Sequence, residues 1–108
     1  MPTHHQIILC TCPDKDTAEK IAHILVNGKL AACVNILPGI TSIYLWHEQI
    51  ESAQEHLLLI KANKTSYPEI EKTLKKHHPY ELPEIIAVPI ENGSPEYLHW
   101  IDACHSSK

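Results

Sequence analysis

The order of apolar and polar positions along the chain predicts strands that alternate with helices. Residues 6–12 form an apolar, β-branched run that is short enough for a buried strand and ends at Pro13. Apolar residues then recur at helical spacing as far as Gly28, which lies where a left-handed C-terminal cap belongs. Asp16 and Glu19 have the spacing of a capping box, so we expect the first helix to begin there.

The middle of the chain predicts extended structure. Residues 32–37 form a second apolar run, which a proline-glycine pair interrupts. Residues 41–46 then have the residue pattern of an extended strand. A bulged or bent hairpin arm fits this pattern. Residues 48–55 are polar and predict a loop or an arm, whereas residues 56–62 are apolar enough for a third core strand.

Two further helices are expected. Ser66 and Glu69 repeat the capping-box spacing, and Pro68 is suited to the first turn of the helix that follows. The apolar spacing of this helix stops near His77. A last helix is predicted from Pro95 to the C-terminal region.

A fourth strand over residues 84–90 completes the pattern. It contains Pro89, which has no backbone N–H to donate and is accepted most easily at a sheet edge or a strand end. The element order is β-α-β-β-α-β plus a C-terminal helix, which matches the split βαβ arrangement of ferredoxin-like folds. We therefore predict an α+β, ferredoxin-like sandwich in one domain, residues 1–108.

The predicted sheet is apolar on both faces. Ile7 and Leu9 point to one face while Ile8 and Cys10 point to the other, and the third and fourth strands repeat this pattern. Two helices on one side cover a single face, so we expect the chain to associate with itself through the other. A closed ring and a two-fold dimer both satisfy this requirement. The alternative is that the C-terminal helix and the arm fold back over the second face.

Composition narrows the classes of function. The net charge is −4 and no Lys/Arg stripe alternates with aromatic residues, so a nucleic-acid partner is not expected. No apolar stretch is long enough to span a bilayer and no leader-like segment begins the chain, so we expect a cytoplasmic protein without a membrane partner. The four cysteines are interpreted as reduced thiols, mostly structural.

Catalysis has little support in the sequence. There is no glycine-rich phosphate loop, no Gly-x-Ser-x-Gly elbow and no His-Glu-x-x-His helix. A nucleophile and base pair made of Cys10 and His77 is conceivable, but a thiol in an apolar run stays protonated and inert. We do not expect an enzyme.

Metal binding is the chemistry that the residue types make available. Cys10 and Cys12 share one face of a strand because they are two residues apart, and a thiolate pair suits Cu(I) or zinc. The alternative is that both thiols pack in the core. On a helix His77 and His78 diverge by about 100°, but Pro79 favours extended angles at the residue before it and can re-aim the rings. The alternative is a favourable interaction of both rings with the helix C-terminus.

Two groups of residues near this segment are open to more than one interpretation. Glu81 and Glu84 either orient the imidazoles, serve as hard ligands, or are simply solvated. Tyr44, Trp46 and Trp100 form either an aromatic wall for a ligand or part of an oligomer interface.

Three segments resemble one known family. Residues 30–35 (LAACVN), residues 38–46 (PGITSIYLW) and the stretch that begins with HHPY at residue 77 and runs to residue 90 are similar in order and spacing to the CutA divalent-cation tolerance family. The similarity runs from about residue 8 to residue 100.

The resemblance implies a ferredoxin-like protomer in a tight homotrimer, similar in architecture to nitrogen-signalling regulatory trimers. It also implies tolerance of copper and other divalent cations, with copper ligands at the positions of Cys10, His77 and His78. Cys12 departs from the pattern of many relatives and either adds a ligand or packs.

Three functions follow from these observations. The first is a homotrimeric, non-enzymatic protein that binds copper or another divalent cation for metal homeostasis. The second is a signalling or scaffolding trimer whose inter-subunit clefts bind a small ligand or a partner protein. The third is a cleft enzyme.

Overall fold

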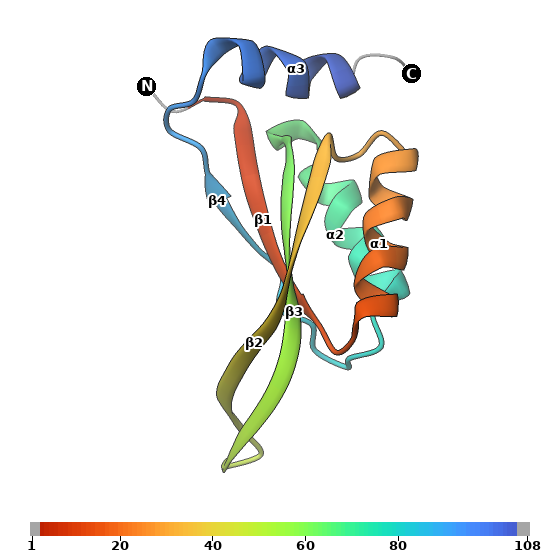
Figure 1. Ribbon diagram of the computed structural model, residues 1–108, viewed down its shortest axis with the longest axis vertical. Coiled ribbons are helices and arrows are strands. Elements are labelled where there is room, and N and C mark those ends of the chain that lie inside the picture. The colour runs from red at the N-terminus through yellow and green to blue at the C-terminus, as the bar shows by residue number, and fades with distance from the viewer. Residues whose placement is uncertain (1–2, 106–108) are drawn as a thin grey trace.

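A computed structural model of the chain describes residues 3–105 and has an α+β fold with one four-stranded antiparallel sheet (Figure 1). Along the chain the elements are β1 (His5–Cys12), α1 (Lys15–Asn27), β2 (Cys33–Trp46), β3 (Gln49–Asn63), a short 3-10 turn η1 (Lys64–Ser66), α2 (Tyr67–His77), β4 (Ile86–Pro89) and α3 (Pro95–His105). Within the described residues, no helix has the length and apolar character that a membrane span requires.

The strand order across the sheet is β2-β3-β1-β4, and every neighbouring pair is antiparallel. β4 lies at the edge, as its proline predicted, and Pro89 is its last residue. The strand is shorter than predicted and spans Ile86–Pro89 instead of residues 84–90. The two residues before it belong to the irregular segment that follows α2 and do not pair with β1.

The core lies between the sheet and the pair α1 and α2, which cover the same face of the sheet (Figure 1). Helical spacing of apolar residues turns one side of each helix toward the strands. The fully buried large side chains of this layer are Ile8, Leu58 and Ile60 from the sheet and Ile21, Leu25, Ile70 and Leu74 from the helices.

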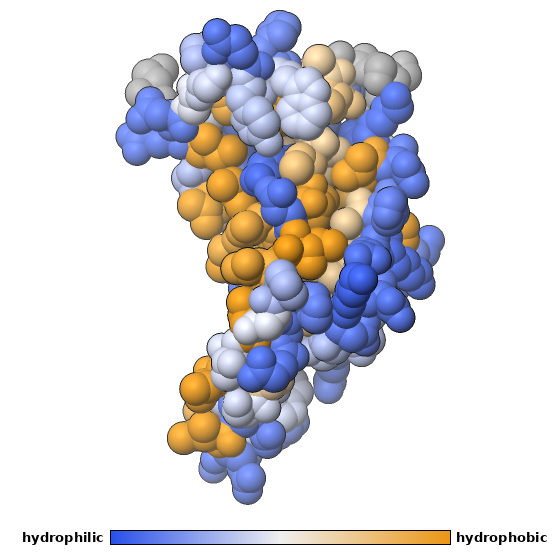
Figure 2. Space-filling view, viewed as in Figure 1, coloured by the Kyte–Doolittle hydropathy of each residue, from blue (hydrophilic) through white to orange (hydrophobic). Residues whose placement is uncertain are grey.

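The opposite face of the sheet is open. Leu37 and Ile86 are each 50% exposed and Val88 is 46% exposed. Figure 2 shows apolar side chains over the strands between α3 and the arm, with a second apolar group farther down the arm. α3 lies across one end of the sheet and the arm extends away from the other, so the alternative in which they fold back over this face is wrong (Figure 1).

β2 and β3 extend beyond the helices as a two-stranded arm (Figure 1). The predicted bulge is confirmed, because the register shifts between Leu37 and Ile40 and Gly39 has φ 73°. The arm closes through His47 and Glu48, both with positive φ, as a two-residue hairpin turn of type I′ requires. Residues 48–55 are therefore mostly the return strand, so the arm alternative holds and the loop alternative is wrong.

The predicted N-terminal cap of α1 is wrong, and the predicted C-terminal cap is right in position but not in conformation. α1 begins at Lys15 and its cap is Asp14, whose side chain accepts a hydrogen bond from the Thr17 amide at 2.8 Å. That bond holds the pKa of Asp14 below its ordinary value. Gly28 is the C-terminal cap, as predicted, but its φ is −81°, and Lys29 takes the positive φ after the helix instead.

The start of α2 also differs from the prediction, whereas its end does not. Ser66 makes no capping hydrogen bond through its side chain, because it closes the turn η1, which Asn63 caps. Pro68 lies in the first turn and the helix ends at His77, as predicted.

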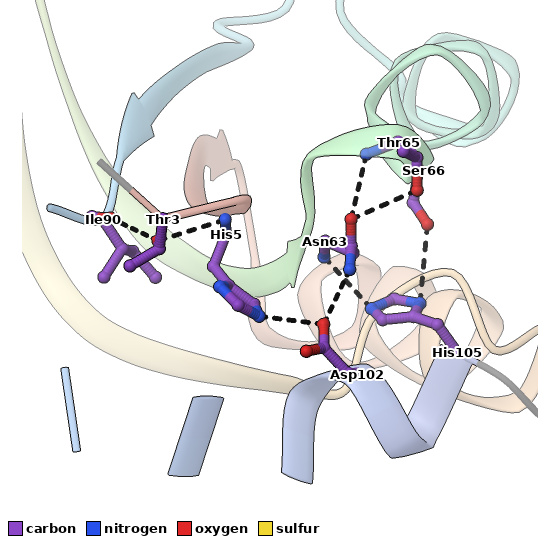
Figure 3. Close-up of polar contacts among 8 residues, drawn as sticks. All are labelled: Thr3, His5, Asn63, Thr65, Ser66, Ile90, Asp102 and His105. Carbon is purple, nitrogen blue, oxygen red and sulfur yellow. Dashed lines mark hydrogen bonds and ion pairs between the residues drawn. The ribbon is translucent and has the colours of Figure 1, made fainter. Parts of the chain in front are cut away.

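α3 is held against the end of the sheet by a polar cluster (Figure 3). His5 Nε2 lies 2.9 Å from Asp102 Oδ1, and the Asn63 side-chain amide donates to the same oxygen at 2.8 Å. The Asn63 backbone N–H donates to His105 Nε2 at 3.1 Å. Ile101 is fully buried beneath the helix, so polar and apolar contacts both fix its position.

Candidate metal centre

Three potential metal ligands meet beneath the C-terminal end of α2. They are the thiols of Cys10 and Cys12 on β1 and the imidazole of His78, and one ligand atom from each lies within 4.8 Å of the other two. Both cysteines are fully buried and His78 is 8% exposed. The group therefore combines two soft donors and one imidazole in a nearly dry environment.

Local backbone geometry explains why these residues meet. Side chains two apart on a strand point the same way, so Cys10 and Cys12 both face the helices. α2 ends at His77, and His78 has φ −82° and ψ 136°, the extended conformation that Pro79 favours at the residue before it. This change of direction turns the His78 ring toward β1, as the predicted unwinding at this point requires.

Both ring nitrogens of His78 have partners. Nδ1 accepts a hydrogen bond from the Tyr80 backbone N–H at 3.1 Å, so the ring proton is on Nε2, which donates to the Thr11 carbonyl at 2.7 Å. The Tyr80 ring also contacts the imidazole, with centroids 4.7 Å apart. The imidazole is thus neutral and held in one orientation, and a metal ion would replace one of the two hydrogen bonds.

The Cys10 and Cys12 thiols interact and shift each other's pKa in opposite directions, while Cys10 Sγ also lies 3.9 Å from the Thr11 carbonyl oxygen. The interaction with Cys12, together with burial, raises the pKa of Cys10. The same interaction lowers the pKa of Cys12, although burial opposes it. Cys12 is therefore the first of the pair to become a thiolate, and the Cys10 S–H stabilises that charge.

The structure brings together two of the three predicted ligands. Cys10 and His78 belong to the cluster, whereas His77 is half-buried as the last residue of α2 and is not part of it. Cys12 takes the third position, which the sequence left as an open alternative between an additional ligand and a packed thiol. The signal that identifies it is its spacing of two from Cys10 on the same strand.

A groove of about 770 Å³ lies beside the centre, between the arm and the segment that links α2 to β4. Tyr44 and Trp46 contribute to its wall, whereas Trp100 pairs with Tyr97 on α3, at 5.5 Å between ring centroids. Glu81 and Glu84 also line the groove, together with Thr11, Ser42, Ile43, Leu45, Glu55, Tyr80, Leu82, Pro83, Ile85 and Ile86.

Tyr80 connects the groove to the metal centre. Its hydroxyl donates to Glu55 Oε2 at 2.6 Å, while its backbone N–H donates to the His78 ring. Glu55 is 5% exposed, so this bond satisfies a buried carboxyl group. Burial and the bond to Glu55 raise the pKa of Tyr80, which keeps the phenol protonated.

The chain matches the family model described as the CutA1 divalent ion tolerance protein over residues 6–104. The chain belongs to the CutA1 family. The divalent-cation tolerance protein CutA of Thermus thermophilus is 46% identical over 96 residues, which cover 89% of this chain and 93% of the relative. Protein CutA of Mus musculus is 46% identical over 91 residues, which cover 84% of this chain and 51% of the mouse protein.

Solved CutA structures have the same fold. The crystal structure of CutA from Xylella fastidiosa matches with a TM-score of 0.94 at 45% identity, covering 96% of this chain and all of that one. The predicted family is confirmed, and with it the α+β architecture. The CutA1 family is named for divalent-cation tolerance, which supports a role of this chain in metal tolerance.

Proposed function

We propose that this chain is a non-enzymatic homotrimer that binds copper or another divalent cation and takes part in metal-ion homeostasis. The observation that supports this proposal best is the buried cluster of two thiols and an imidazole. Relatives whose names refer to divalent-cation tolerance also support a role in metal-ion homeostasis.

The donor set fits copper. Thiolate and imidazole ligands suit Cu(I), and imidazole suits Cu(II), which heads the affinity order of the divalent ions. The ligands proposed from the sequence are Cys10, His77 and His78; the first and last belong to the cluster, and His77 would have to join from outside it. A bound ion would be sequestered away from water, since the cluster is buried.

The trimer, the ferredoxin-like arrangement and the compartment also remain proposals. The open apolar face of the sheet supports self-association, and the strand order β2-β3-β1-β4 is consistent with the ferredoxin-like pattern. The four free cysteines support a reducing, cytoplasmic compartment.

Calorimetric titration with Cu(I), Cu(II) and Zn(II) under anaerobic conditions tests the proposal. The wild-type protein should bind copper stoichiometrically, and the triple variant Cys10→Ser, His77→Ala, His78→Ala should lose that binding. The control variant His23→Ala, His99→Ala also removes two imidazoles, both exposed, and should bind as the wild type does. Metal binding that survives in the triple variant contradicts the proposal.

A second candidate function rests on the groove between the arm and the α2–β4 segment. Its volume of about 770 Å³ is within the range of small-ligand sites, and it combines aromatic walls with carboxyl groups. A signalling or scaffolding trimer that binds a small ligand or a partner protein would use such a surface. Stoichiometric metal binding together with no binding from metabolite panels contradicts this alternative.

A further inference from the structure

We infer that Cys12 is a metal ligand, and that Cys10, Cys12 and His78 of one protomer form a three-coordinate site selective for Cu(I), to which His77 does not contribute. This inference rests on the proposed metal-binding function and specifies its ligands and its ion.

The positions of the donors support a single site. An ion with ligand distances of about 2.3 Å to sulfur holds three donors about 4 Å apart in trigonal geometry. The donor atoms of Cys10, Cys12 and His78 already lie within 4.8 Å of one another, so closure on an ion needs movement of less than about 1 Å. All three donors come from one chain, so the site is complete without a partner subunit.

The number and type of donors favour Cu(I). Thiolates select soft ions, whereas a structural zinc site is almost always completed by a fourth ligand. Among the described residues, only these three His, Cys, Asp or Glu side chains converge in this way. Burial of the site leaves little room for water as a fourth ligand, since the three residues are 0%, 0% and 8% exposed.

The backbone at the end of α2 explains the exclusion of His77. His77 is the last helical residue of α2 and is half-buried, whereas His78 is extended and its ring nitrogen Nε2 lies 2.7 Å from the Thr11 carbonyl oxygen. Neighbouring side chains across such a change of direction do not reach one ion without unwinding the last helical turn. His77 is therefore a half-buried imidazole that lies next to the site and outside the cluster.

Binding is an exchange of protons for metal. Cu(I) replaces the proton of each thiol, two S–Cu bonds form, and two protons pass to the buffer. The neutral imidazole gives up one of its hydrogen bonds and contributes a nitrogen lone pair. No electron is transferred, because copper enters in the reduced state.

Competition with a chromophoric Cu(I) chelator in the absence of oxygen tests the inference. Cys12→Ala should weaken Cu(I) binding at least about 100-fold, because even a partner that only supports a ligand contributes about 10–100-fold. Cys33→Ala removes a free thiol outside the cluster and should leave the affinity within about 3-fold of wild type, as should His77→Ala. X-ray absorption of the copper-loaded protein should show two sulfur neighbours and one nitrogen neighbour.

A second measurement covers the case in which Cys12→Ala fails to fold. In the wild-type protein one equivalent of Cu(I) should protect both Cys10 and Cys12 from alkylation in denaturant-free buffer at elevated temperature, and leave Cys33 unprotected. Protection of Cys10 alone, retention of affinity in Cys12→Ala, or tighter binding of Zn(II) than of Cu(I) overturns the inference.

The outcomes separate this inference from the proposed function. If the wild-type protein binds copper and His77→Ala abolishes that binding while Cys12→Ala does not, the metal function stands and the assignment of Cys12 is wrong. If the wild-type protein binds none of the three ions, both are wrong.

Discussion

At the scale of single residues, Tyr80 joins the groove to the candidate metal centre. Its hydroxyl bonds the buried Glu55 and its backbone N–H bonds the His78 ring. A buried carboxyl group that loses its donor retains the full cost of its desolvation. The hydroxyl of Tyr80 therefore stabilises the folded chain even though it touches no metal ligand.

Tyr80→Phe tests this role. The change keeps the ring against His78 and removes only the bond to Glu55, so the free energy of unfolding should fall by about 1.5–3 kcal/mol. Denaturation in urea at one fixed protein concentration measures the change. Tyr44→Phe, at a tyrosine that is 44% exposed, should change stability by less than about 0.5 kcal/mol. Equal effects of the two substitutions would contradict the role.

Some residue positions can be predicted from the sequence and others cannot, for physical reasons. The common direction of Cys10 and Cys12 follows from strand periodicity alone. The inward turn of His78 follows from the restriction that Pro79 places on it. The meeting of Cys12 with His78 depends on how α2 packs across β1, which is a tertiary property, and so the sequence left Cys12 as an open alternative.

At the scale of elements, chain order and periodicity predicted the strands and helices well where one face is buried. The caps were harder, because Asp14 and Asp16 are both suitable residues and only the N–H of Thr17 decides between them. The return strand of the arm was ambiguous because no core covers it, so its residues show no apolar alternation. Its turn, His47 and Glu48, lacks the Asn-Gly type of signal that marks a hairpin.

Asp102 is the α3 side chain that bonds two side chains of the sheet, in addition to the contact between His105 and the Asn63 backbone (Figure 3). Asp102 accepts from His5 and from Asn63, and His5 is only 7% exposed. The other ring nitrogen of His5 is buried without a hydrogen-bond partner among the described residues. Loss of Asp102 would therefore leave the whole imidazole unsatisfied.

Asp102→Ala should lower the free energy of unfolding by about 1–3 kcal/mol, the cost of a buried polar group left without its partner. Amide hydrogen exchange should show faster opening of α3 than of β1. Asp102→Asn keeps a side-chain oxygen that accepts hydrogen bonds and should retain most of the protection. If α3 exchanges at the wild-type rate in Asp102→Ala, the cluster does not hold the helix.

At the scale of the whole molecule, the dominant feature is a sheet with one covered and one open face. Two helices packed on one side of a four-stranded sheet leave its other face uncovered. The uncovered face could therefore be predicted from strand periodicity and the number of helices and strands alone. The number of copies that cover the open face cannot be predicted in the same way, because a closed ring and a two-fold dimer bury it equally well.

If the proposed trimer forms through the open face, Val88→Asp should shift it to smaller species, since the substitution places a charge where β4 contributes a 46% exposed side chain. Val26→Asp is the matched control, because Val26 is 40% exposed but lies on α1. Sedimentation velocity at several concentrations measures both. A wild-type protein that stays monomeric, or two variants with the same mass, would contradict the trimer.

Because the bulge at Gly39 lies at the base of the arm, a small backbone rotation there moves the tip of the arm by a larger distance. Seven residues of β2 follow the bulge, Ile40 to Trp46, which span roughly 23 Å in extended form. A rotation of about 10° at the bulge therefore displaces the end of the arm by about 4 Å, roughly the spacing of two neighbouring strands. The positive φ of Gly39, which the absence of a Cβ permits, thus influences where the apolar tip with Ile43, Leu45 and Ile50 would reach on a neighbouring copy in the proposed trimer.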